Sequence, residues 1–276
     1  MKKLVVAGCS FTAGQGWVDC NGDPEQSRRL EGKDSPYLWV NLCHTNIKQF
    51  QDLELINAGL GGASNTQIFE NTIDTLVNHH TNIDTLMVQW TSMPRYAWNV
   101  GLELWDTTET LAGDNPRKHD HRLSDGTVYS RKYLQDLRDR LITTHHLHWE
   151  ILKLLKYATI INRYCDRFDI KCVFINGLCP WDQDYFVRLN NAVPSDYTVF
   201  TQTAILNVKD RSDDDVFKLY CKIHDDYNQH TLQTSQWINL YNSFWKNRVD
   251  VNYDGTHPGV RSNQLFCQIV KKFVEA

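Results

Sequence analysis

A serine, an aspartate and a histidine stand where they could act together in nucleophilic catalysis. Ser10 closely follows the apolar run Leu4–Ala7, and Asp254 and His257 lie three residues apart in "DGTHPG" near the other end of the chain. A serine hydroxyl becomes a good nucleophile when a histidine takes its proton, and that histidine needs a carboxylate to fix its tautomer. One tight turn can present both Asp254 and His257, so these residues predict a catalytic triad.

Other interpretations of these residues are open at this point. Most serines that follow a strand are helix caps, and Ser10 could be one. Its neighbour Cys9 could be the reactive atom instead, although a thiol in such a place more often packs inward as a small apolar group. Asp254 and His257 could merely form a hydrogen-bonded turn with Pro258, but that interpretation does not account for the other motifs described below.

Short apolar runs predict the strands that would position these residues. Each run is nearly continuously apolar, as parallel strands covered on both faces tend to be. The runs are Leu4–Ala7, Leu53–Asn57, Thr85–Trp90 and Lys171–Asn176, with a weaker fifth candidate at Trp237–Tyr241.

Helical patterns separate these runs. Residues 66–80 place Ile68, Ile73, Leu76 and Val77 on one stripe, a long periodic stretch starts at Tyr133, and an amphipathic terminal segment follows Pro258. The long stretch fits two helices or one bent helix. Strands that alternate with helices predict an α/β fold with a doubly wound parallel sheet.

Ligands of such sheets bind outside the carboxyl ends of the strands. The second predicted strand runs into "NAGLGGASN" at residues 57–65, where Gly61 and Gly62 would let a substrate approach the backbone. Either glycine could supply an N–H group to an oxyanion. A glycine-rich turn before a helix can also bind phosphate, but the chain has neither a Walker lysine nor the full dinucleotide fingerprint.

The order of these motifs resembles the SGNH (GDSL-type) hydrolase family. "GCSFTAG" resembles its first block, with Ser10 as nucleophile and Cys9 where aspartate is common. "NAGLGGASN" resembles the second block, with Gly62 as the oxyanion glycine, and "DGTHPG" resembles the last block, with Asp254 and His257 completing the triad. The three motifs lie near the N-terminus, near residue 60 and near the C-terminus, so the resemblance extends over nearly the whole chain. It implies a flavodoxin-like three-layer α/β/α sandwich and a cofactor-free esterase, lipase, carbohydrate deacetylase or thioesterase.

This chain departs from the family's pattern in the third block. That block normally ends a strand with GxND, whose asparagine donates to the oxyanion, whereas this chain continues as "QWTSMPRYAW". Thr91 or Ser92 could donate a hydroxyl hydrogen bond from about the same place, and Asn65 is another amide within reach. Loss of one oxyanion donor costs on the order of a hundred- to a thousand-fold in rate. A substitute donor, weakened catalysis and a non-hydrolytic role are therefore all open.

Length and composition restrict the remaining choices. The 276 residues, with 41% hydrophobic and 22% charged residues, fit one folded domain over 1–276 with insertions around 97–131 and 181–215. The net charge of −4 gives no sign that the chain binds nucleic acid or an anionic membrane surface. The start "MKKLVVAGCS" is too short for a secretory signal, and no stretch is long enough for a membrane helix. We expect a cytoplasmic or phage-associated protein.

Cysteine and histidine usage argues against a metal centre. The eight cysteines form no CxxC pair, which favours reduced thiols over a structural zinc site. Histidines cluster at 119–121 and 145–148, and His145 and His148 could share a helix face and bind a metal. Solvated or core-edge histidines are commoner, and no third ligand is evident. We expect neither a metal nor a cofactor.

These observations predict a serine esterase that acts on a small-molecule or glycan ester, such as an O-acyl or O-acetyl group on a carbohydrate. The aromatic residues suggest a flat apolar or sugar-ring surface; they are Trp90, Tyr96, Trp98, Trp181 and Tyr185. Arg95 could hold an anionic substrate group or make an ordinary surface ion pair. The alternatives are a catalytically inactive carbohydrate-binding module of the same fold and a nucleotide-binding flavodoxin-like domain. The oligomeric state cannot be predicted.

Overall fold

A computed structural model shows the positions of the elements. It describes residues 1–91, 97–99, 105–107, 121–122, 128–130, 132–133, 136, 147–177, 236–238, 244, 247–255 and 257–276. Six of the eight cysteines are among them, and all six are free thiols. No helix in this part of the chain is long and apolar enough to cross a membrane.

A five-stranded parallel sheet forms the centre of the fold, in the order β2-β1-β3-β8-β9. Its strands are β1 (Lys3–Gly8), β2 (Glu54–Gly59), β3 (Ile83–Trp90), β8 (Lys171–Asn176) and β9 (Gln236–Ile238). In chain order the arrangement is 2-1-3-4-5, the flavodoxin-like order. The predicted strands are confirmed: β8 has the predicted bounds, the ends of β1, β2 and β3 differ from the prediction by at most two residues, and β9 is Gln236–Ile238 rather than Trp237–Tyr241.

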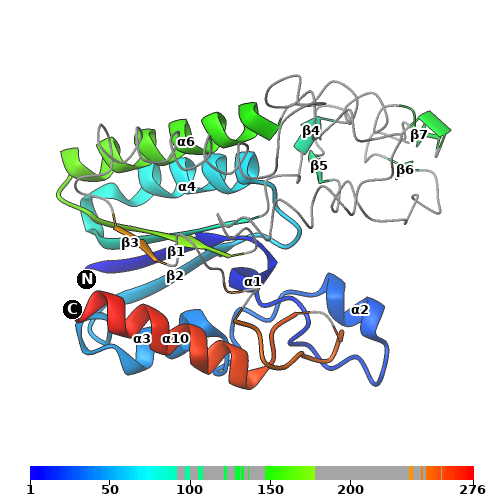
Figure 1. The fold of residues 1–276 in the computed structure, drawn as a ribbon, viewed down its shortest axis with the longest axis horizontal. Helices are drawn as coiled ribbons and strands as arrows, with labels where there is room; N and C mark the ends of the chain where they lie inside the picture. Colours follow the sequence, from blue (N-terminus) through cyan, green and yellow to red (C-terminus); the bar gives the residue numbers. More distant parts are fainter. Residues whose placement is uncertain are drawn as a thin grey trace, which may run out of the picture.

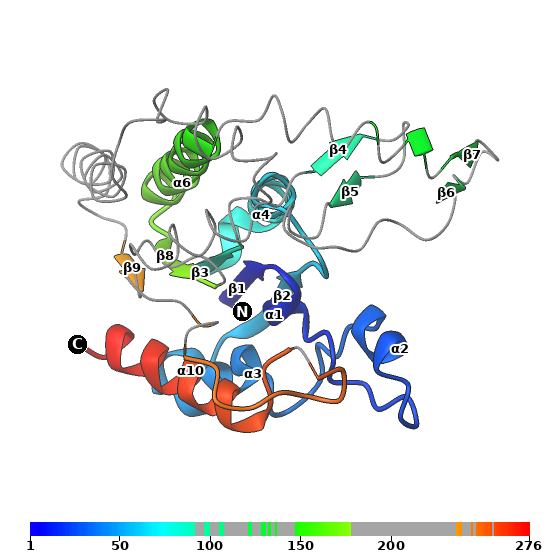
Figure 2. The ribbon, with the colours of Figure 1, turned by 45° about the vertical axis from the view of Figure 1, so that its right-hand side comes forward.

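Helices cover both faces of the sheet. α4 (Asn65–His79) and α6 (Leu147–Arg167) lie on one face, and α3 (Trp39–Asn46) and α10 (Val260–Val274) on the other (Figure 1). Figure 2 shows α3 and α10 next to each other, and the two helices are in contact. The predicted three-layer α/β/α sandwich is therefore confirmed.

The shorter helical segments lie in the connections. They are α1 (Ser10–Ala13), α2 (Pro24–Arg29) and the 3₁₀ turns Lys48–Phe50 and His80–Asn82. α1 begins two residues after β1 ends, at the edge of the sheet to which the first strand points (Figure 1).

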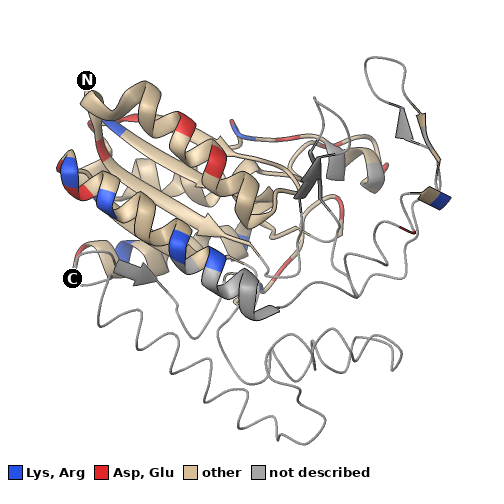
Figure 3. Ribbon diagram, turned by 90° about the horizontal axis from the view of Figure 1, so that it is seen from above, with Lys and Arg blue, Asp and Glu red and all other residues tan. Residues whose placement is uncertain are grey.

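Charged residues of the four longer strands stand at their amino ends. Lys3, Glu54, Asp84 and Lys171 are each the first or second residue of their strand, and Lys3 Nζ lies 3.6 Å from Glu54 Oε1. Figure 3 shows the remaining charges mainly on helices and connections. Burial of a strand on both faces excludes charge from its centre, because an unpaired buried charge is costly.

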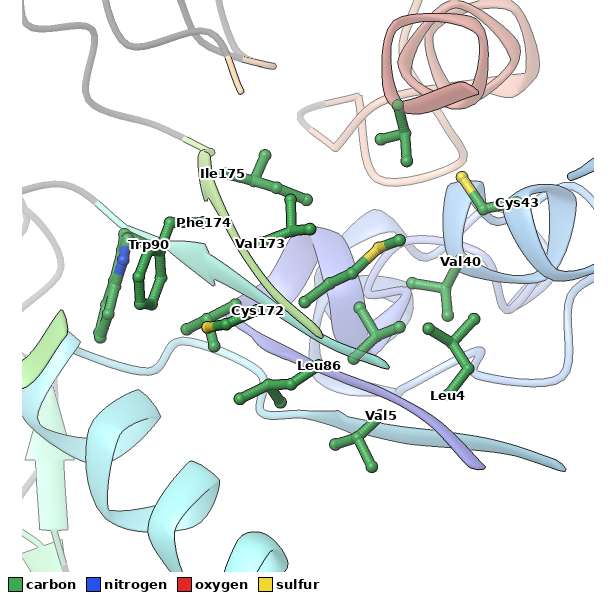
Figure 4. Close-up of a cluster of buried hydrophobic side chains, with 14 of the residues drawn as sticks. Leu4, Val5, Val40, Cys43, Leu86, Trp90, Cys172, Val173, Phe174 and Ile175 are labelled. Atoms are coloured by element: carbon green, nitrogen blue, oxygen red, sulfur yellow. The ribbon is translucent and has the colours of Figure 1, made fainter. Parts of the chain in front are cut away.

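Side chains of the sheet pack with those of the covering helices into one buried apolar cluster. Figure 4 shows Trp90 of β3 beside Phe174 of β8, and their rings stack with centroids 6.0 Å apart. On α4, Ile68 and Leu76 are fully buried, but Val77 is 56% exposed. The placement of Val77 on the buried stripe is therefore wrong. Positions four apart, such as 68, 72 and 76, form that stripe, and Val77 lies about 100° further around the helix.

Two small antiparallel pairs occur within the first predicted insertion. β4 (Ala97–Asn99) pairs with β5 (Trp105–Thr107), and β6 (His121–Arg122) with β7 (Val128–Tyr129). Strands of two or three residues are too short to show alternation, so they could not be predicted from the hydrophobic pattern. The predicted insertion 181–215 and most of 133–146 lie outside the described residues.

Candidate active site

Asp254 and His257 form a buried hydrogen-bonded pair. Nδ1 of His257 is hydrogen bonded to Oδ2 of Asp254, and the His257 backbone N–H donates to Oδ1 of the same carboxylate at 2.9 Å. The two residues are 3% and 8% exposed. A carboxylate at Nδ1 fixes the proton on that nitrogen, so that Nε2 carries the lone pair that can act as a base.

The turn between these residues is closed by backbone hydrogen bonds. The Gly255 N–H donates to the Asn252 carbonyl at 2.8 Å, and the Asn252 N–H donates to the His257 carbonyl at 2.8 Å. An isolated antiparallel bridge between Val251 and Pro258 closes the base of the loop. The predicted tight turn is confirmed.

Asn263 on α10 fixes this loop to the body of the fold. Its Nδ2 donates to the carbonyls of Pro258 at 3.0 Å and Gly259 at 2.8 Å, and its Oδ1 accepts from the Trp39 N–H at 2.9 Å. Asn263 therefore connects the start of α3, the start of α10 and the loop that carries His257.

Gly16 packs directly behind the carboxylate. Its backbone has a φ of +83°, and a Cβ at this position would lie 2.9 Å from both Cγ and Oδ1 of Asp254. Any larger residue would therefore press on Asp254. The charge of this carboxylate also acts on Arg248. Burial lowers the pKa of Arg248, and the nearby negative charge of Asp254 opposes that shift.

Ser10 lies at the same edge of the sheet as this pair. It is the first residue of α1, and its Oγ is buried without a hydrogen-bond partner among the described residues. The N-cap of α1 is Cys9, so the interpretation of Ser10 as a helix cap is wrong. The next residue, Phe11, packs edge-on against His257 with ring centroids 5.8 Å apart. The structure thus brings the Ser10 turn to the histidine.

Cys9 faces inward instead. It is fully buried, and its Sγ lies 3.9 Å from Oε1 of Gln89 on β3. This agrees with the prediction that the thiol packs as a small apolar group.

Gly62 lies in the turn after the neighbouring strand. The Leu60 N–H donates to the Gly8 carbonyl at 2.9 Å, which holds this turn against the end of β1. Gly62 has a φ of +70°, whereas the Gly61 N–H is already donated to Oε1 of Glu31 at 2.8 Å. Of the two glycines, Gly62 therefore keeps its N–H unbonded within the described residues.

Thr91 and Asn65 join the second and third blocks of the sequence. The Thr91 N–H donates to Asn65 Oδ1 at 2.9 Å, and Asn65 Nδ2 lies 3.4 Å from the Thr91 carbonyl. The Asn65 amide thus holds the chain at the end of β3. The Thr91 hydroxyl is buried without a partner in the described part of the chain.

Some predicted site residues are elsewhere or undescribed. Trp90 is 1% exposed and belongs to the core, so its assignment to a substrate surface is wrong. Ser92, Arg95 and Trp181 lie outside the described residues. Of the other residues considered from sequence, Tyr96, Tyr185, His119 and His145 also lie outside the described residues. Across the described ranges, no three His, Cys, Asp or Glu side chains are grouped as a metal site would require.

Sequence reasoning missed three supporting residues: Gly16, Asn263 and Gln89. Gln89 had a visible signal, because it is a polar residue inside the otherwise apolar end of a predicted strand. Gly16 had none, since Asp254 is far away in sequence, and neither had the contact of Asn263 with Trp39.

Comparisons with known proteins find similarity in structure only. No protein-family model matches the chain, and no curated protein matches it in sequence. Similar solved structures include a lipolytic protein of the G-D-S-L family from Desulfitobacterium hafniense, with 8% identity, 99% of each chain covered and a TM-score of 0.46. The lipase/acylhydrolase from Enterococcus faecalis has 12% identity, coverage of 100% of this chain and 96% of that chain, and a TM-score of 0.45.

The acetyl xylan esterase AlAXEase is a further similar structure, with 14% identity, 98% of each chain covered and a TM-score of 0.41. GDSL and SGNH hydrolases recur among the similar structures. This is the family that the sequence motifs resemble.

Proposed function

We propose that this protein is a serine esterase that uses Ser10, His257 and Asp254 as its triad. The observation that carries the proposal is the buried pairing of Asp254 with Nδ1 of His257, next to the turn that carries Ser10. That pairing leaves Nε2 as the base, which is the form a serine nucleophile requires.

Acylation begins when Ser10 Oγ attacks the ester carbonyl and His257 Nε2 takes the hydroxyl proton. The tetrahedral intermediate carries a negative oxygen, and Asp254 stabilises the imidazolium that has formed. Collapse of the intermediate breaks the carbon–oxygen bond of the ester, and Nε2 gives its proton to the departing alcohol.

Deacylation repeats these steps with water. His257 Nε2 takes a proton from the water as it attacks the acyl-enzyme, and it then returns that proton to Ser10 Oγ as the acid leaves. The cycle consumes one water and needs no cofactor.

The oxyanion would be held by the N–H groups of Ser10 and Gly62. Ser10 opens a helix, where the first N–H groups have no intrahelical partner. The third donor would be the hydroxyl of Thr91 or of Ser92, in place of the family's asparagine. Thr91 is favoured as this donor because its Oγ1 has no hydrogen-bond partner within the described ranges and its backbone is held by Asn65.

We propose a small-molecule or glycan ester as the substrate, with an O-acetyl group on a carbohydrate as the first candidate. This choice rests on the aromatic residues near 96–98 and 181–185 in the sequence and on the resemblance to carbohydrate-active family members. Arg95 and Trp181 are the residues that we expect to contact the substrate.

The test is hydrolysis of p-nitrophenyl acetate together with fluorophosphonate labelling mapped by mass spectrometry. We expect wild type to be active and tagged on Ser10, and Ser10→Ala to lose both. Cys9→Ala is the matched control one residue away, and it should keep the tag on Ser10. A folded wild type that shows neither activity nor a tag would contradict the proposal and favour an inactive carbohydrate-binding module.

A further inference from the structure

Gln89 makes a buried hydrogen bond to the helical turn that carries Ser10. It is the last but one residue of β3 and is fully buried. Its Oε1 accepts a hydrogen bond from the hydroxyl of Thr12, which is the third residue of α1 and is also fully buried. A single side chain thus connects the third strand to the turn that follows the first strand.

The fold leaves space for this side chain by placing glycines on both sides of it. A Cβ on Gly8, at the end of β1, would lie 2.9 Å from both Cβ and Oε1 of Gln89. A Cβ on Gly177, just after β8, would lie 2.8 Å from Cδ of Gln89. Real Cβ atoms do not approach other atoms so closely, so a larger residue at either position would displace Gln89. The flanking glycines and the amide therefore form one packed arrangement.

α1 depends on such contacts for its position. It has only four residues, and its N-cap Cys9 makes no side-chain capping bond. A helix of this length is unstable by itself, so tertiary contacts must hold it. Thr12 provides two of them: its carbonyl accepts from Asn57 Nδ2 on β2 at 2.8 Å, and its hydroxyl donates to Gln89 on β3. The turn is held from the strands on both sides of β1.

We propose that Gln89 is a positioning residue for the nucleophile. Through Thr12 it fixes the rotation of α1 and hence the direction of Ser10 Oγ relative to His257. This inference rests on the proposed function, because it assumes that Ser10 is the nucleophile. Gln89 itself does not touch the reacting atoms.

The experiment measures the rate constant of fluorophosphonate labelling per reactive site. Gln89→Met and Thr12→Val each remove the hydrogen bond with little change in volume, and Thr12→Ser keeps the hydroxyl. Since a misplacement of about 1 Å can cost about 100-fold in rate, we expect Gln89→Met and Thr12→Val to lower the labelling rate at least about tenfold. Thr12→Ser should stay near wild type. The KM for p-nitrophenyl acetate should change little while kcat falls.

Two further variants separate positioning from a general loss of structure. Thr72→Val removes another fully buried threonine hydroxyl, which bonds to the Ile68 carbonyl within α4, and it should label at the wild-type rate. The double variant of Gln89→Met and Thr12→Val should label no more slowly than the slower single variant, because both remove one interaction.

Each outcome has one meaning. If wild type is labelled and Gln89→Met labels at the same rate per site, with only a lower melting temperature or fewer reactive sites, the positioning role is refuted and the proposed function stands. Additive losses in the double variant would also refute it. A folded wild type that is not labelled at Ser10 would refute the proposed function itself, and with it the role of Gln89.

Discussion

Replacement of Gly16 by alanine tests whether the backbone behind Asp254 sets the geometry of the triad. A Cβ at this position would lie 2.9 Å from Asp254 Cγ, whereas carbon atoms in contact normally lie about 3.5–4.0 Å apart. Relief of this overlap requires a shift of roughly 0.6–1 Å in the carboxylate or the Gly16 backbone. Such a shift should cost about 10- to 100-fold in kcat, because a 1 Å misplacement can cost about 100-fold.

The substitution also has a cost that is independent of the site. Gly16 has a φ of +83°, and an alanine in that left-handed region costs about 1–2 kcal/mol. Gly22→Ala is the matched control, since Gly22 has a φ of +86° and no atom within 4 Å of its Cβ position. The two variants share only the cost of the left-handed backbone, so Gly16→Ala should lose at least as much unfolding free energy as Gly22→Ala, and only Gly16→Ala should lose kcat.

The assay combines p-nitrophenyl acetate hydrolysis with urea unfolding of both variants. Fluorophosphonate titration gives the number of reactive sites, so kcat refers to folded enzyme alone. The reasoning would be refuted if Gly16→Ala kept the wild-type kcat per site, or if Gly22→Ala lost as much activity as Gly16→Ala.

Substitutions at three other residues test the surroundings of the site. Thr91→Val, which removes the proposed hydroxyl donor, should lower kcat about 100- to 1,000-fold, while Thr91→Ser should retain most of it; equal rates for the two would rule out this donor. Burial alone raises the pKa of Asp250, but hydrogen bonds from Ser262 and the backbone N–H of Arg261 outweigh it and lower the pKa. The folded state then binds fewer protons than the unfolded state, so this contribution to stability is present above about pH 4 and is lost as pH falls through the lower folded pKa. Urea unfolding of Asp250→Asn across that range should show a weaker decline than wild type, and parallel curves would contradict the assignment. Asn263→Ala removes the side-chain partner of the Trp39 N–H and of the Pro258 carbonyl, whereas the Gly259 carbonyl still accepts from the backbone N–H of residue 263. The loss of these two bonds should cost about 2–4 kcal/mol of unfolding free energy and lower kcat by loosening the loop of His257; unchanged urea midpoints would show that the bonds are replaced.

The sequence alone predicted the elements whose local signal is strong. Continuous apolar runs identified four strands, because burial on both faces leaves room for charge only at the strand ends. Asp254 and His257 could be paired from sequence since one turn of three residues joins them. The contact between Gly16 and Asp254 could not be predicted from sequence, because it depends on how a loop more than 200 residues later returns to the first strand. The prediction that Val77 is buried was wrong for a simpler reason. A hydrophobic pattern shows that a helix has a buried face, but it does not show how far around the helix that face extends.

The missing asparagine of the third block has a physical counterpart in the pairing of Asn65 with Thr91. An asparagine in the loop after β3 would bring its own donor to the site, whereas here an amide from the start of α4 binds the backbone at that point. This bond occupies the Asn65 carbonyl oxygen and fixes the Thr91 backbone, and the Thr91 hydroxyl is left without a hydrogen-bond partner among the residues that the structure describes. A buried hydroxyl with no partner costs about 1–3 kcal/mol, a cost that a bound oxyanion would remove. If Thr91 is the donor that we propose, the arrangement would be least favourable in the empty site and would improve as negative charge develops, which is the condition for stabilising a transition state.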